Sequence, residues 1–243
     1  MRPALLIALL LPLPAPAQEA RFSFGASAGW ANLAMRAVRQ DNEDDVDGFN
    51  VLGFPVAPFP ELNPVPFVTA RAAYRFSHAG SVFLSVQIFA RNLAATTPDG
   101  QPHLDLQRGL GATDVMLGAA HHFPLSLGDL DVTAELAVGT TRAWVHAEAF
   151  GTEIPLGKEA EETLRFDSET DYTLSSPFAM AGMAAGLPLP GPFVLNAAAR
   201  YKTGPITKMA GKTTDLGVTK SLISQVEFDF SGLFLSLGLA LEF

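Results

Sequence analysis

The chain ends in the stretch GLFLSLGLALEF, which runs from Gly232 to Phe243. Every second position of this stretch holds a large apolar residue: Leu233, Leu235, Leu237, Leu239, Leu241 and Phe243. The positions between them are mostly small or polar: Phe234, Ser236, Gly238, Ala240 and Glu242. A period of two residues is typical of a β-strand, whose side chains point alternately to its two faces. The stretch therefore predicts a final strand with one wholly apolar face.

The same alternation recurs along the chain, in residues 22–30, 68–76, 82–90, 115–123, 130–138 and 193–201. A helix would distribute these residues around a cylinder, so the pattern favours strands throughout. Segment 175–187, SSPFAMAGMAAGL, is small and apolar on both faces and could also form a helix. We assign it as a strand because the number of connections around it requires one.

The connections between the strands alternate in length. Short turns are expected at 77–81, 124–129 and 188–192, and long polar segments at 40–65, 93–108, 143–174 and 203–220. This alternation predicts an all-β fold of eight antiparallel strands in up-and-down order. Short periplasmic turns opposite long extracellular hairpins are typical of a transmembrane β-barrel. With an even number of strands, both termini lie on the periplasmic side.

The beginning of the last strand admits two readings. Apolar residues from Leu222 to Phe230 continue a strand pattern, but its phase shifts at Ser231 and Gly232. A β-bulge, for which glycine is suited, would keep the strand continuous. A turn there would add a ninth strand and place Phe243 on the other side, so we favour the bulge.

The amino-acid composition limits the classes of protein to which the chain can belong. Of 243 residues, 48% are hydrophobic and 17% are charged, whereas soluble domains usually carry about 25% charged residues. The net charge of −9 argues against a nucleic-acid partner, because phosphate groups select a basic face. The absence of cysteine excludes disulfides, thiol catalysis and a lipidated cysteine.

Residues 1–17 have the features of a cleaved signal peptide. An arginine precedes an apolar run at 4–11, and Ala-Pro-Ala at 15–17 supplies a small-x-small cleavage pattern. The alternative is a transmembrane anchor, but prolines interrupt the run, and it is shorter than the roughly 20 residues that a spanning helix needs. We therefore expect residues 18–243 to form one exported barrel domain.

These features resemble those of the small bacterial outer-membrane β-barrels, in particular the OmpA-barrel, OmpX and OmpW groups. In that family the last strand with its closing aromatic residue is the signal read by the barrel-assembly machinery. Here the resemblance assigns that role to Leu237, Leu239, Leu241 and Phe243. It further implies a bacterial outer-membrane location, contact with lipid and lipopolysaccharide, and no cofactor. We expect a monomer.

Three functions follow from the resemblance. The first is non-enzymatic: porin-like or OmpW-like passage of small solutes, or envelope integrity. The second is a surface barrel that binds an extracellular partner through its loops. The third is an outer-leaflet lipid enzyme, for which the chain offers His146 and Glu148 with Ser175 or Ser176. We favour the first.

A polar network is expected inside the barrel. The interior of an eight-stranded barrel is about wide enough for side chains to fill, and buried charges must pair because an isolated buried charge is costly. The alternative to such a salt-bridged plug is a narrow polar path. The residues expected to face the lumen are Arg71, Arg75, Gln87, Arg91, Asp114, Glu135, Asn196, Arg200, Lys202 and Glu227.

Two further stretches call for an interpretation. In DNEDDVDG, residues 41–48, the side chains of Glu43, Asp45 and Asp47 match the first positions of a calcium loop, but Phe54 stands where a bidentate glutamate is needed. We therefore expect a solvated loop. Segment 48–67 is rich in Phe, Val, Leu and Pro. It is expected either to fold back over the barrel mouth or to offer an apolar contact.

The two adjacent histidines, His121 and His122, point to opposite faces of their strand, so they do not chelate one metal. We expect His122 in the lumen and His121 at the membrane interface.

Overall fold

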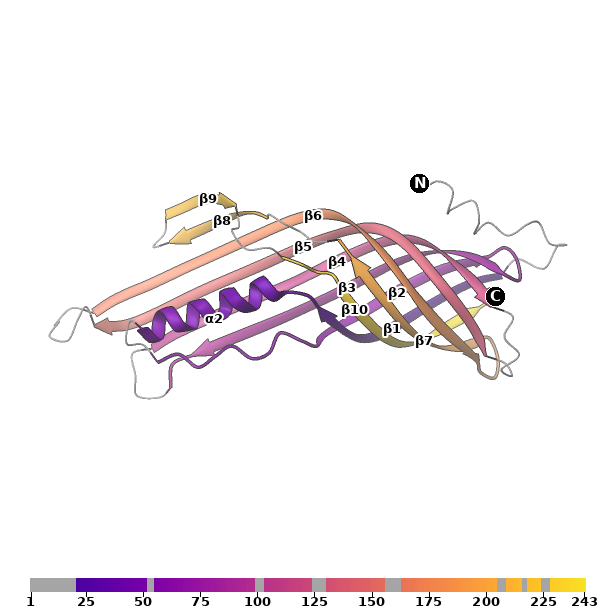
Figure 1. The fold of residues 1–243 in the computed structure, drawn as a ribbon, viewed down its shortest axis with the longest axis horizontal. Helices are drawn as coiled ribbons and strands as arrows, with labels where there is room; N and C mark the ends of the chain where they lie inside the picture. The colour runs from indigo at the N-terminus through magenta and orange to yellow at the C-terminus, as the bar shows by residue number, and fades with distance from the viewer. Residues whose placement is uncertain are drawn as a thin grey trace.

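A computed structural model describes residues 21–51, 55–98, 103–123, 130–155, 163–204, 209–215, 218–223 and 228–243 of the chain. The expected signal peptide lies outside these ranges. Eight hydrogen-bonded strands close into a ring, as predicted (Figure 1). They are β1 (Arg21–Leu33), β2 (Val65–Arg75), β3 (Gly80–Thr96), β4 (His103–Phe123), β5 (Asp131–Pro155), β6 (Thr163–Pro188), β7 (Phe193–Thr203) and β10 (Gly232–Glu242).

The ring closes where β10 pairs with β1 and β7, all antiparallel. The leucine row of β10 points outward, and Leu237 is 59% exposed. The opposite face turns into the barrel, where Phe234 is buried. The backbones of Phe22 and Phe243 exchange two hydrogen bonds of 3.2 and 2.9 Å, so the start of β1 and the last residue of the chain lie at one end, here called the termini end. The apolar face predicted for the last stretch is thus the outer face of a closed barrel.

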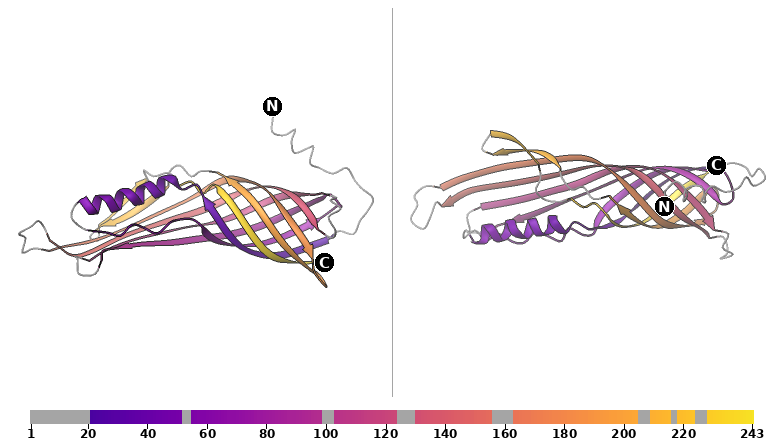
Figure 2. Two further views of the ribbon diagram at one scale, coloured as in Figure 1. Left: turned by 60° about the horizontal axis from the view of Figure 1, so that its bottom comes forward. Right: turned by 45° about the horizontal axis from the view of Figure 1, so that its top comes forward.

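Four of the strands continue well past the ring. β4, β5 and β6 contain 21, 25 and 26 residues, although about 9–11 residues suffice to cross a bilayer. Together with the end of β3 they form a long sheet at the far end, here called the extension (Figures 1 and 2). A hairpin of β8 (Ala210–Asp215) and β9 (Val218–Ile223) joins it by pairing with β6.

A helix, α2 (Arg36–Val51), lies along the extension (Figure 2). Its Val46 packs with Leu104 and Leu106 of β4 on the face that continues the barrel interior. Arg108, on the same face, forms ion pairs with Asp41 and Asp45 of the helix. Within the described residues, no helix is long and apolar enough to cross a membrane.

The long polar segments are largely regular structure and form the long hairpins that the alternation predicted, apart from 40–65, where the helix was not predicted. The segment 40–65 contains most of α2, and 93–108 and 143–174 are mainly strand. The segment 203–220 contributes to the β8–β9 hairpin. In 93–108 and 143–174 the strands continue beyond the apolar band of the ring.

The predicted start of the last strand is also corrected. Residues 218–223 form β9, which pairs with β8 and stays outside the ring. β10 begins at Gly232 and pairs with β7 in unbroken register to Leu241, so the expected bulge at Ser231–Gly232 does not form. Instead, the register between β5 and β6 shifts between Gly151 and Ile154. The segment 175–187 is strand, as predicted.

Candidate functional site

The inward side chains are arranged in layers along the barrel axis. At the termini end, polar groups line a cavity of about 140 Å³, here called the vestibule. A central buried ion pair follows, and an apolar layer fills the far end of the ring. This order reflects strand position, because each strand contributes every second residue to the lumen.

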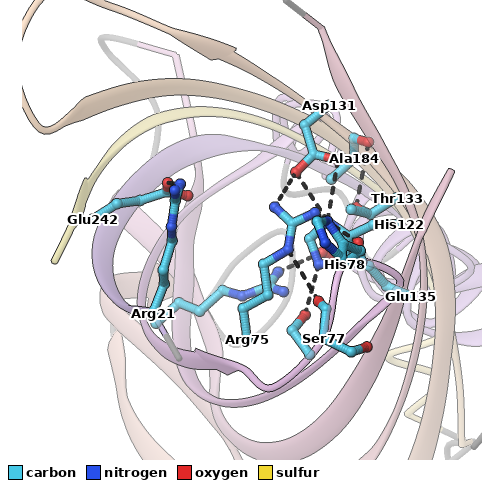
Figure 3. A network of polar contacts seen from close by, with 12 residues as sticks. Arg21, Arg75, Ser77, His78, His122, Asp131, Thr133, Glu135, Ala184 and Glu242 are labelled. Carbon is cyan, nitrogen blue, oxygen red and sulfur yellow. Dashed lines mark hydrogen bonds and ion pairs between the residues drawn. The ribbon is translucent and has the colours of Figure 1, made fainter. Parts of the chain in front are cut away.

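The first polar cluster of the vestibule connects β2, β3, β4 and β5. The Nη1 of Arg75 lies 3.2 Å from Asp131 Oδ2, and His122 Nδ1 lies 2.9 Å from the same oxygen and 3.1 Å from Oδ1 (Figure 3). His122 Nε2 lies 3.0 Å from Ser81 Oγ. Arg75 also donates to the backbone oxygens of Ser77 and His78, which ties the β2–β3 turn to the barrel wall.

The second cluster is centred on Glu135 of β5. Its two carboxylate oxygens accept hydrogen bonds from Arg71 Nη1 at 2.5 Å and Arg200 Nε at 2.6 Å. Glu135 is 4% exposed, and the guanidinium of Arg71 also lies 3.8 Å above the ring centroid of Phe83. One carboxylate between two arginines thus links β5, β2 and β7, of which no two are neighbours in the ring.

The central layer is a fully buried ion pair. Lys202 Nζ lies 2.7 Å from both carboxylate oxygens of Asp114, which also accepts a hydrogen bond of 2.7 Å from Thr141. The ammonium group lies 4.6 Å from the ring centroid of Phe178 and 5.5 Å from that of Phe89. Oxygen ligands on one side and aromatic faces on the other satisfy a charge that would otherwise be costly to bury.

Beyond the ion pair, aromatic rings occupy the lumen. Phe89, Phe230 and Phe234 are almost completely buried, and the ring centroids of Phe230 and Phe234 lie 5.7 and 6.1 Å from that of Phe89. Met35, directly before α2, and Val38, in its first turn, belong to the same cluster. The described residues thus fill this section of the barrel with apolar side chains.

Segment 48–67 folds back over the barrel interior, which was one of its two expected placements. Leu62 and Val65 join the apolar layer, and Val56 packs between α2 and the extension. The side-chain oxygen of Asn63 accepts a hydrogen bond of 2.9 Å from the backbone of Leu33 and fixes this crossing.

Most residues expected in the lumen are placed there. Arg91 donates to the backbone oxygen of Glu61 at 3.3 Å, near the far end, and does not pair with a carboxylate among the described residues. Glu227 lies outside the described residues. The residues that line the vestibule or the layers above it are Arg71, Arg75, Gln87, Asp114, Glu135, Asn196, Arg200 and Lys202.

The calcium interpretation of Glu43, Asp45 and Asp47 does not hold, and neither does the solvated loop expected in its place. These residues lie in α2, where alternate positions point to opposite sides of the helix and do not converge on one cation. Asp45 instead pairs with Arg108 at 2.7 Å. Desolvation raises the pKa of Asp45 above its ordinary value, although Arg108 opposes the shift.

His146 does not meet the serines that an acyl-transfer site would need. It lies opposite Asp171, whereas Ser175 and Ser176 lie opposite Arg142 and Thr141. Four residues along a strand amount to about 13 Å. His146 Nδ1 is 2.8 Å from Asp171 Oδ1, and this hydrogen bond raises the pKa of His146 despite partial burial.

The link between Ser81, His122 and Asp131 was not predicted. Each residue has the lumen-facing phase of its own strand, but only the register between β3, β4 and β5 brings them together. The order Ser–His–Asp is that of serine hydrolases. Ser81 is only 4% exposed, and the 140 Å³ vestibule is smaller than the roughly 300–1,000 Å³ of small-molecule sites. The three side chains link β3, β4 and β5 at the barrel wall.

Comparison with known proteins identifies structures with a similar fold. No family model matches the sequence, and no curated protein matches it. The structure aligns with a major outer-membrane protein from Thermus thermophilus at 12% identity and a TM-score of 0.58, over 93% of this chain and 100% of that one.

The structure also aligns, less closely, with OprG from Pseudomonas aeruginosa, at 9% identity over 92% of this chain and 96% of that one, with a TM-score of 0.48. Ail of Yersinia pestis aligns at 12% identity over 92% and 97%, with a TM-score of 0.43. At these identities the likeness concerns the fold alone. The chain has the fold of the small outer-membrane β-barrel proteins.

Proposed function

We propose that the protein is a non-enzymatic outer-membrane barrel whose ring is a closed anchor and whose extension stands at the bacterial surface. The proposal combines envelope integrity with binding of an extracellular partner. The observation that carries it is the filled lumen: a buried ion pair and an aromatic layer occupy the section between the vestibule and the extension.

A lipid environment is supported by the outer face of the ring. Large apolar side chains point outward on strands all around it, including Leu84 at 52%, Leu117 at 62% and Val138 at 65% exposure. In water, such a continuous apolar band would be unfavourable, whereas in a bilayer it contacts the apolar lipid chains without this cost. Contact with lipid and lipopolysaccharide, and recognition of Leu237, Leu239, Leu241 and Phe243 by the assembly machinery, are part of this proposal.

The extension supports a role at the surface. β9 is the last strand of the sheet and pairs on one side only with β8 among the described residues. It exposes Val218 at 58% and Ile223 at 65%. A strand edge without a partner strand is suited to pairing with another chain. Passage of small solutes, the other function expected, would require these interior layers to move.

The location and orientation are tested by cysteine labelling, because the chain has no cysteine of its own. Ser221→Cys on β9 should react with a membrane-impermeant maleimide on intact cells. His78→Cys, in the β2–β3 turn, should react only after the outer membrane is permeabilised. Labelling in the opposite order would overturn the orientation, and absence of the protein from the outer-membrane fraction would overturn the location.

The closed lumen is tested in planar bilayers with the purified, refolded full chain. We expect no stepwise conductance from the wild-type protein, with an open porin inserted as the positive control. Reproducible single-channel steps from the wild type would contradict a closed anchor and support passage.

A further inference from the structure

The outer face of the β5–β6 pair carries four polar residues in a rectangle. In the register of the two strands, His146 lies opposite Asp171 and Glu148 lies opposite Glu169. Directly opposite residues share a face, and their β-carbons are about 4.5–5.5 Å apart. The neighbouring Val145 and the partly buried Tyr172 point to the other face, into the apolar cluster. The rectangle therefore faces solvent on the outside of the extension.

The imidazole lies among carboxylates on both of its nitrogens. His146 Nδ1 is 2.8 Å from Asp171 Oδ1 and 3.9 Å from Glu169 Oε1. On the other side of the ring, Nε2 is 3.8 Å from Glu148 Oε2. One ligand atom from each of His146, Glu169 and Asp171 can be chosen so that all lie within 4.8 Å of one another.

The local charge balance favours an added cation. Three carboxylates surround one imidazole, and Glu148 and Glu169 are like charges placed directly opposite each other, which destabilises a strand pair. Lys212 of β8 lies opposite Asp171 on its other side and supplies one positive charge at the edge of the group. Even with His146 protonated and Lys212 counted, these groups hold more negative than positive charge.

The backbone beneath the rectangle is held on both sides. β5 is paired with β4 and β6 at this level, and β6 is paired with β5 and β8. His146 and Asp171 thus project from interior strands of a sheet, which fixes their α-carbons while their exposed side chains can still rotate. Ligand sites built on regular elements are held more precisely than sites on loops.

We infer that this rectangle binds a divalent transition-metal cation of the Zn²⁺ class. His146 Nδ1, Asp171 and Glu169 are the ligands, and water completes the tetrahedron. Ligand bonds of about 2.0–2.2 Å to Zn²⁺ place ligand atoms about 3.4 Å apart, so side-chain rotation must adjust ligand atoms that now lie within 4.8 Å of one another. An imidazole ligand selects such metals over Ca²⁺ and Mg²⁺, which prefer oxygen alone.

Glu148 has a different role in this arrangement. With Nδ1 on the metal, the remaining ring proton is on Nε2, which faces the Glu148 carboxylate. A carboxylate that accepts from the second nitrogen orients the imidazole and increases its basicity. Glu148 is thus a positioning residue, and the bound metal would hold β5 and β6 together at the extension.

The test is calorimetric titration of ZnCl₂ into the tag-free, refolded full chain in detergent micelles. We expect one Zn²⁺ per chain, and at least about tenfold weaker binding by His146→Ala and by Asp171→Asn, with a smaller loss for Glu148→Gln. His78→Ala, a histidine in a distant turn, is the matched control and should bind as the wild type does. CaCl₂ should bind far more weakly than ZnCl₂.

A second readout separates binding from folding. Saturating Zn²⁺ should raise the Tm of the wild type and of His78→Ala but not of His146→Ala, with EDTA reversing the shift. If His146→Ala does not refold, Asp171→Asn supplies the same comparison. Absence of Zn²⁺ binding, equal Zn²⁺ binding by His146→Ala, or equal affinity for Ca²⁺ would overturn the inference. The measurement is made in micelles and does not depend on the cellular location or the closed lumen.

Discussion

Lys202 Nζ lies 2.7 Å from both carboxylate oxygens of Asp114, and neither side chain has any exposed surface. The two residues are 88 positions apart in the chain and belong to β7 and β4, which are not neighbours in the ring. The pair therefore spans the lumen. Removing one partner leaves a buried charge without its counter-charge, whereas removing both does not, and this asymmetry can be measured.

We predict that Lys202→Met destabilises the barrel far more than the double variant Lys202→Met/Asp114→Leu. Breaking a buried pair costs about 3–5 kcal/mol, whereas an apolar replacement of both partners is often close to neutral. The free energy of unfolding, measured by urea titration of the refolded barrel with tryptophan fluorescence, checks this. Equal losses in the single and double variants would show that the charge itself is not the source of the cost.

A matched control is available at the exposed termini end. Arg21 Nη1 lies 4.0 Å from Glu242 Oε2, and the side chains are 58% and 38% exposed. Exposed pairs of this kind contribute about 0–1 kcal/mol. Arg21→Gln should therefore change the free energy of unfolding by no more than this, although it also removes one positive charge from the barrel.

Arg108 is predicted to hold α2 on the extension. Its guanidinium is the shared partner of Asp41 and Asp45, one helical turn apart. Each hydrogen bond to a charged group contributes about 1.5–3 kcal/mol, so Arg108→Ala should increase local opening of the helix by at least about tenfold. Trypsin cleavage after Arg36 and Arg39 should accelerate accordingly. Unchanged cleavage would mean that Val46 and its apolar contacts hold the helix without the arginine.

Asp45 gives a prediction with a defined dependence on pH. Because desolvation raises its pKa in the folded state, its contribution to stability is full below the ordinary carboxyl pKa and is lost as pH rises through the raised value. Asp45→Asn removes this ionisation and keeps an acceptor for Arg108. The variant should resist trypsin at least as well as the wild type at pH 7, and its advantage should vanish in acid. A variant less stable at pH 7 would contradict this.

The ring could be predicted from the sequence because a period of two residues is a local signal. Each strand has one face toward the lumen and one toward the outside, so the leucines from Leu233 to Leu241 indicate which face of their strand is outward, whatever the neighbouring strands are. The helix could not be recognised in the same way. Its inner face, Val38, Asn42 and Val46, recurs every four residues, but Asn42 and the surrounding acidic residues hide the period.

The candidate sites depend on the register between neighbouring strands, which cannot be read from the sequence of any single strand. His122 was expected in the lumen, and the structure places it there, but its partners Ser81 and Asp131 depend on how three strands are aligned. The same holds for His146, whose predicted serine partners lie four and five residues along β6 from the position opposite it. Distance along the sequence carries no information on such pairs, because a shift of register changes every cross-strand neighbour.

Phe243 offers a test that separates folding from assembly in the cell. Its two backbone hydrogen bonds to Phe22 survive in Phe243→Ala, while its ring, whose centroid lies 6.5 Å from that of Phe24, is lost. A ring that is 70% exposed contributes little to the barrel itself. Refolding into micelles, followed by heat-modifiable migration on gels, should therefore be nearly normal. If the ring is part of an assembly signal, the amount of folded barrel in the outer-membrane fraction should fall several-fold. Equal losses in both assays would assign the residue to stability, and no loss in either would show that the ring is not part of such a signal.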